Sequence, residues 1–86
     1  MASRLIIADD HDVVRQGLRD IFAHTPDLEV VAEAADGVEA ERLARETPAD
    51  LLLLDISLPR RRGVLVLESL RAAGIRIPVL FFPMHP

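Results

Sequence analysis

Short apolar runs and amphipathic stretches alternate along this chain. Segments rich in apolar residues have the length of β-strands and cover residues 5–8, 28–34, 51–54 and 77–82. The runs at residues 5–8 and 51–54 are unbroken, which is typical of strands buried on both faces of a parallel sheet, and the segment 28–34 is rich in valine. The pattern therefore predicts four strands separated by helices.

The first amphipathic stretch carries apolar residues at i, i+4, i+7 and i+8. These residues are Val14, Leu18, Ile21 and Phe22. The spacing places them on one face of a helix over residues 12–24, which would begin with Asp12 as its N-cap. Thr25-Pro26-Asp27 would end this helix.

Two further helices are indicated by their terminal residues. Asp36 and Glu39 have the spacing of a capping box, which predicts a helix running to residue 46. The third helix is predicted over residues 64–73, and Gly74 would cap its C-terminus. The order is βαβαβαβ, which is typical of an α/β fold whose parallel sheet carries helices on both faces.

Three aspartates follow predicted strands. Asp9 and Asp10 come after the first strand, and Asp55 follows four leucines at the end of the third. Carboxyl ends of neighbouring parallel strands meet at one edge of a sheet, where ligands bind. Converging carboxylates repel one another, and a divalent cation such as Mg²⁺ relieves that repulsion. An aspartate can also act as a nucleophile toward phosphorus. The alternative interpretation of the Asp9-Asp10 pair, without a functional role, is a solvated loop or a helix cap.

These motifs together resemble the receiver domain of two-component response regulators, in the branch with a LuxR-type output domain. The likeness covers essentially the whole chain. The matching segments are LIIADDH (5–11), VRQGL (14–18), VVAEAADG (30–37), DLLLLDISLP (50–59) and IPVL (77–80).

The resemblance implies a flavodoxin-like, doubly wound parallel sheet with strand order 2-1-3-4. It implies that Asp55 is the phosphoacceptor, that Asp10 binds Mg²⁺ directly and that Asp9 supports the ion through water. The backbone carbonyl of Ser57 would be a further metal ligand, and Pro59 would shape the following loop. The implied partner is a sensor histidine kinase, and the parent protein would be a DNA-binding transcriptional regulator.

The chain also departs from the family pattern. The family has five βα units, so residues 1–86 would be one receiver domain that is truncated after its fourth strand. The missing part would hold a phosphate-contacting lysine, and all ten basic residues of this chain are arginines. Pro83 stands where the family has a serine or threonine. An uncovered fourth strand would favour homo-oligomers through its edge.

The Pro59-Arg60 pair replaces the Pro-Gly turn of the family, so we expect a rebuilt loop, because arginine takes a positive φ reluctantly. The triplet Arg60-Arg61-Arg62 has two interpretations. It could attract a phosphoryl donor electrostatically, or it could be a solvated loop, which we favour. His11 is interpreted as a surface residue, and His85 as part of a tail.

Composition excludes several classes of function for this chain. A net charge of −4 argues against nucleic-acid binding by this segment, and the absence of cysteine excludes disulfides and thiolate zinc sites. No apolar run could span a membrane and no signal peptide is apparent, which points to the cytoplasm. An aspartate-nucleophile phosphatase would need an acid where Ser57 stands, so we do not expect an enzyme.

Two hypotheses stay open. The chain is either a receiver phosphorylated on Asp55 or a degenerate receiver that acts as a phosphorylation-independent interaction module. The three aspartates favour the first, and the missing lysine and Pro83 favour the second.

Overall fold

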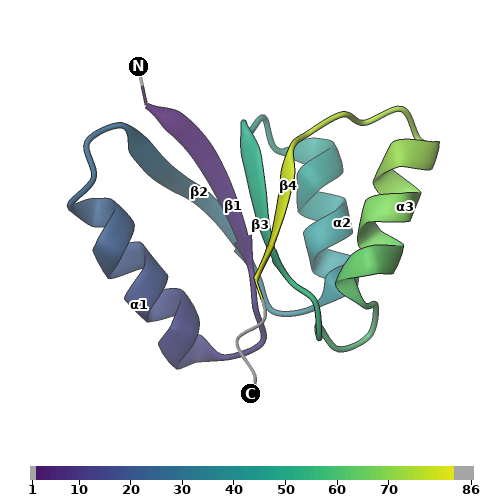
Figure 1. The fold of residues 1–86 in the computed structure, drawn as a ribbon, viewed down its shortest axis with the longest axis horizontal. Coiled ribbons are helices and arrows are strands. Elements are labelled where there is room, and N and C mark those ends of the chain that lie inside the picture. Colours follow the sequence, from purple (N-terminus) through teal and green to yellow (C-terminus); the bar gives the residue numbers. More distant parts are fainter. Residues whose placement is uncertain (1, 83–86) are drawn as a thin grey trace.

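The computed structural model describes residues 2–82 as a four-stranded parallel sheet with helices on both faces (Figure 1). The strand order is β2-β1-β3-β4. The elements are β1 (Ser3–Ala8), α1 (Asp12–Ala23), β2 (Leu28–Ala34), α2 (Gly37–Glu46), β3 (Leu51–Asp55), α3 (Gly63–Ala72) and β4 (Val79–Phe82). The predicted fold class and strand order are confirmed.

Helix boundaries follow the predicted caps with one correction. Asp36 Oδ1 accepts the backbone N–H of Glu39 at 2.8 Å, as a capping box requires, although Glu39 accepts the N–H of Ala35 instead of that of Asp36. Asp12 is not the N-cap of α1. It is the first helical residue, and His11 occupies the cap position with extended backbone. The first helical hydrogen bond runs from the Arg15 N–H to the His11 carbonyl, one residue before the predicted cap, and the Asp12 carboxylate accepts the Arg15 guanidinium instead of a backbone N–H.

The last helix and the last strand differ by one or two residues from the predicted bounds. Strand β4 begins at Val79, two residues later than predicted, and α3 begins at Gly63. Gly74 has φ = 79°, so it caps α3 in the left-handed conformation as expected. Both Phe81 and Phe82 are partly buried, and Phe81 packs against the hydrophobic core.

The hydrophobic core lies between the sheet and the helix pair α2–α3. We call this side of the sheet the α2–α3 face and the opposite side, where α1 lies, the α1 face (Figure 1). Small and branched residues fill the α2–α3 face. They include Ile6, Ala8, Leu52 and Leu54 from the strands and Ala40, Ala44, Val66 and Leu70 from the helices. Burial of these side chains is the main source of stability.

The loop between β3 and α3 is held against the start of α2. The N–H of Gly37 donates to the carbonyl of Pro59 at 3.1 Å, and a Cβ atom on Gly37 would lie 1.8 Å from the carbonyl oxygen of Arg61. Only glycine permits so close an approach of two backbones. The loop after Asp55 and the first turn of α2 are therefore packed together.

One prediction about the arginine triplet is wrong. The loop is not rebuilt to avoid a positive φ, because Arg60 itself takes φ = 68°. The triplet is largely solvated, as favoured from the sequence, because Arg60 and Arg62 are exposed and the Arg61 side chain is 40% exposed. Arg60 pairs with Asp36 at 3.0 Å, and Arg61 pairs with Glu41 of α2. These two ion pairs tie the loop to α2 and stabilise the unusual turn.

Among residues 2–82, no helix has the length and apolar character needed to cross a membrane.

Candidate functional site

Asp9 and Asp55 lie next to each other at the carboxyl ends of β1 and β3. The two strands are adjacent and parallel, with Ala8 in register with Leu54, so the residues that follow them meet at one edge of the sheet. Both side chains are fully buried. Asp10 continues from Asp9 into the loop before α1. The predicted convergence of the three aspartates is confirmed, because their carboxylates and His11 offer ligand atoms within 4.8 Å of one another.

Hydrogen bonds fix one oxygen of each buried carboxylate. Asp9 Oδ1 accepts the backbone N–H of His11 at 2.6 Å, and Asp55 Oδ1 accepts the backbone N–H of Ser57 at 3.0 Å. The second oxygen of Asp9, Oδ2, is buried and has no hydrogen-bond partner within the described part of the chain. A buried polar atom in this state is costly, and a ligand that binds it would stabilise the fold.

The electrostatics of the site favour a cation. Burial raises the pKa of the Asp9 carboxyl above its ordinary value, and the neighbouring Asp55 carboxyl raises this pKa further. The hydrogen bond from the His11 amide acts in the opposite direction on the same pKa. Two buried carboxylates side by side are unfavourable when both are ionised, and a bound cation removes that penalty.

The residues present fit a Mg²⁺ ion. Carboxylate oxygens are the ligands that this ion prefers, and Asp9 offers an oxygen without a donor among the described residues. Asp10, which is partly exposed, can supply a second carboxylate, and Asp55 a third. The role of the Ser57 carbonyl as a ligand stays a prediction, as do the individual roles of the three aspartates.

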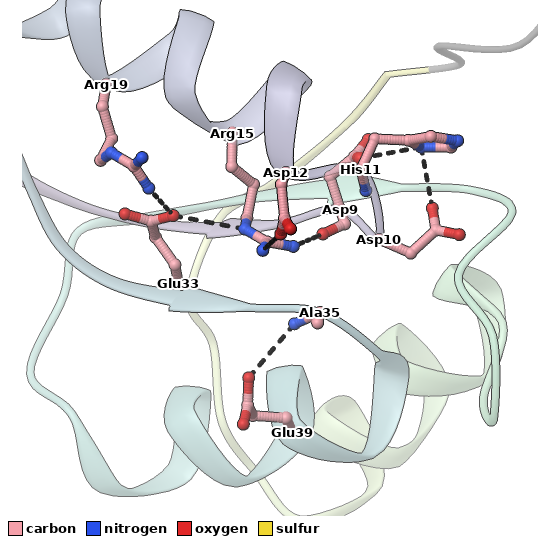
Figure 2. A network of polar contacts seen from close by, with 9 residues as sticks. All are labelled: Asp9, Asp10, His11, Asp12, Arg15, Arg19, Glu33, Ala35 and Glu39. Carbon is pink, nitrogen blue, oxygen red and sulfur yellow. Dashed lines mark hydrogen bonds and ion pairs between the residues drawn. The ribbon is translucent and has the colours of Figure 1, made fainter.

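Two residues that the sequence interpretation misses lie at this site (Figure 2). His11 is exposed, as the sequence predicts, and its Nδ1 also lies 3.1 Å from Asp9 Oδ1 and 3.0 Å from Asp10 Oδ1, contacts that the sequence did not predict. No pattern assigns a role to Arg15, yet its guanidinium donates to the Asp9 carbonyl. The sequence signals were the adjacency of His11 to the aspartates and the i, i+3 spacing of Asp12 and Arg15. Pro83 and His85 lie outside the described residues.

Comparisons with known proteins assign this chain to one family. The response regulator receiver domain family matches residues 5–86. The transcriptional regulatory protein YhcZ of Bacillus subtilis is 51% identical over 66 residues, which cover 77% of this chain and 31% of YhcZ. The oxygen regulatory protein NreC of Staphylococcus aureus is 47% identical over 66 residues, which cover 77% of this chain and 30% of NreC. The match thus spans about a third of the length of these curated relatives.

Solved structures agree on the fold. A LuxR-family two-component response regulator from a species of Aurantimonas superposes with a TM-score of 0.86 at 39% identity, covering 100% of this chain and 61% of that one. The signal receiver domain of NarL from Mycobacterium tuberculosis gives a TM-score of 0.92 at 29% identity, covering 99% of this chain and 68% of that one.

Proposed function

Because this chain belongs to the response regulator receiver domain family, we propose that it accepts a phosphoryl group on Asp55 from a phosphohistidine of a sensor histidine kinase. The observation that carries the proposal is the position of Asp55. Its carboxylate is buried at the end of β3, beside the buried Asp9 carboxylate whose Oδ2 has no hydrogen-bond partner among the described residues. Such a pair is suited to bind a cation and to present a carboxylate nucleophile.

In the proposed step, a carboxylate oxygen of Asp55 forms a bond to phosphorus while the P–N bond of the phosphohistidine breaks. The electron pair of that bond returns to the imidazole of the kinase, and Asp55 becomes an acyl phosphate. Mg²⁺, when bound, would offset the negative charge of the phosphoryl oxygens. Asp9 and Asp10 would hold the ion, and the N–H of Ser57 orients Asp55 through its Oδ1.

Intact-protein mass spectrometry tests the proposal. The purified chain is incubated with acetyl phosphate in the presence of Mg²⁺, and separately with excess chelator. We expect one added phosphoryl group with Mg²⁺ only, and none in Asp55→Asn. Asp10→Ala should lose most of the product because it removes a metal ligand. Phosphorylation that persists in Asp55→Asn would contradict the assignment of the phosphoacceptor.

The alternative is a degenerate receiver that binds a partner without phosphorylation. It is supported by the sequence, which has no lysine and carries Pro83 in the register of the usual serine or threonine. An Asp55 that stays unmodified in both phosphodonor and kinase assays would favour this alternative.

The parent protein is proposed to be a cytoplasmic transcriptional regulator. The names of YhcZ as a transcriptional regulatory protein and of the LuxR-family response regulator support this proposal. The matched region covers only part of each of these proteins, so DNA binding would belong to a segment other than residues 2–82.

A further inference from the structure

Arg15 reaches from the first turn of α1 back to the loop that carries Asp9 and Asp10 (Figure 2). Its guanidinium donates one hydrogen bond to the backbone carbonyl of Asp9 and another to the carboxylate of Asp12. Its Nε lies 3.3 Å from Oε1 of Glu33 on β2. One side chain therefore joins the end of β1, the start of α1 and a neighbouring strand.

Burial distinguishes Arg15 from the next arginine of α1. The Arg15 side chain is 14% exposed, whereas that of Arg19 is 46% exposed. Arg19 also pairs with Glu33, at 2.5 Å, but among the described residues no hydrogen bond or ion pair joins it to the loop that carries Asp9 and Asp10. Arg19 is therefore a natural control for the loss of an arginine on this helix.

The charge of Arg15 is offset locally. Asp12 and Glu33 pair with its guanidinium, and Glu33 is shared with Arg19. Two positive and two negative side chains thus form one neutral network beside the site. Arg15 can therefore hold the loop in place without adding net positive charge that would compete with a bound cation.

The Asp9 carbonyl belongs to the peptide group that joins Asp9 to Asp10. A planar guanidinium that holds this carbonyl and two carboxylates from fixed directions restricts rotation of that peptide. The orientation of the peptide decides the direction in which the Asp10 side chain leaves the loop. We propose that Arg15 is a positioning residue of the metal site, which fixes the Asp9–Asp10 peptide so that both carboxylates point toward the cation. This inference rests on the proposed function.

Titration calorimetry with Mg²⁺ tests the inference on the whole chain and three variants. Residues that orient metal ligands typically change affinity by about 10–100-fold when mutated, so Arg15→Met should weaken Mg²⁺ binding by that factor. Arg15→Lys keeps the charge but offers a single ammonium in place of a planar fork, so we expect it to stay about tenfold weaker than the wild type. Arg19→Met should bind Mg²⁺ with unchanged affinity.

Urea unfolding of the same proteins separates positioning from a general loss of stability. A purely structural role would lower stability by the same amount in chelator and in excess Mg²⁺. A positioning role also diminishes the gain in unfolding midpoint that Mg²⁺ produces. If Arg15→Met does not fold, Arg15→Lys alone decides between the two outcomes.

Three results would overturn the inference. The first is wild-type Mg²⁺ affinity in both Arg15 variants, and the second is full recovery in Arg15→Lys, which would mean that charge alone matters. The third is a wild-type chain that binds no Mg²⁺, which would also remove the proposed function. Mg²⁺ binding that depends on Arg15, together with an Asp55 that never takes a phosphoryl group, would support the inference and reject only the proposed function.

Discussion

The two faces of the sheet are stabilised in different ways. On the α2–α3 face, residues of both strands and helices are buried together in one continuous core. On the α1 face, the strands bury Leu5 and Ile7, but α1 contributes no buried residue, and Ile21 of this helix is 61% exposed. Leu80 of β4 is in register with Leu53, so it points to the same face, where it is 56% exposed.

The difference between the two faces shows how the cluster of Asp9, Asp10 and Asp55 is supported. The α2–α3 face supplies most of the apolar burial that holds β1 and β3, and therefore Asp9 and Asp55, in place. The α1 face supplies polar contacts instead, in which Arg15 ties α1 to the loop and to β2. We infer that the α2–α3 face governs stability and that the α1 face governs the orientation of the loop that carries Asp9 and Asp10.

The largest contrast is expected between truncations of Leu70 and Ile21. Leu70 is fully buried against the sheet, so Leu70→Ala should lower the free energy of unfolding by about 2–5 kcal/mol. Ile21→Ala removes an exposed side chain and should change it by less than about 0.5 kcal/mol. Equilibrium urea denaturation measures both. Equal losses would show that α1 is packed as tightly as α3.

Alanine substitutions of two glycines should change the stability in opposite directions. Gly37→Ala places a Cβ against the carbonyl of Arg61, so the loop must shift, at about 1–3 kcal/mol of stability. Gly17 lies within α1, where an added Cβ would meet no atom within 4 Å, so Gly17→Ala should gain about 0.5–1 kcal/mol through helix propensity. Thermal melts of the two variants test the pair. Destabilisation by Gly17→Ala would contradict the open surroundings of α1.

A smaller effect is expected on self-association of the chain through strand β4. This strand lies at one end of the described sheet, and Leu80 within it is exposed. We predict self-association through this strand, weakened about tenfold by Leu80→Arg, since a lost apolar contact of about 1.4 kcal/mol corresponds to that factor. Val13→Arg on α1 is the matched control, and sedimentation velocity over a concentration series is the measurement. A monomer at every concentration would refute the prediction.

The smallest effect concerns Glu41, which joins α2 to α3 and to the loop after Asp55. The hydrogen bond from Ser69, with contributions from Arg45 and Arg61, holds the pKa of Glu41 below its ordinary value of 4.5. A lowered pKa in the folded state means that this stabilisation is present above pH 4.5 and is lost as the pH falls through the folded pKa. Because ion pairs near the surface contribute little, we expect less than about 1 kcal/mol.

Glu41→Gln should therefore flatten the decline of stability in acid, as measured by urea unfolding between about pH 3 and pH 7, roughly the range over which carboxylates titrate. Glu46→Gln, whose carboxylate pairs with Arg42 on the exposed side of α2, is the control. An unchanged slope in Glu41→Gln would argue against the network.

The sequence predicted the sheet and its aspartates because both depend on local patterns. An apolar run followed by Asp9 or Asp55 is visible along the chain, and a parallel sheet brings such ends together. The contacts of Arg15 with Glu33 and of Arg61 with Glu41 join elements far apart in sequence, and no periodicity encodes them. Arg60 escaped prediction for a similar reason, since its left-handed backbone is compensated by an ion pair to Asp36 on another element.

The close approach of Gly37 to Arg61 also decides where a reporter group can be placed. A label at position 37 would push the loop away, because its Cβ has no room. The next residue, Val38, is exposed on the same first turn of α2, so a fluorophore or spin label there would leave the contact intact. Because that turn is packed against the loop after Asp55, the label would report rearrangements of the loop from a position outside the aspartate cluster.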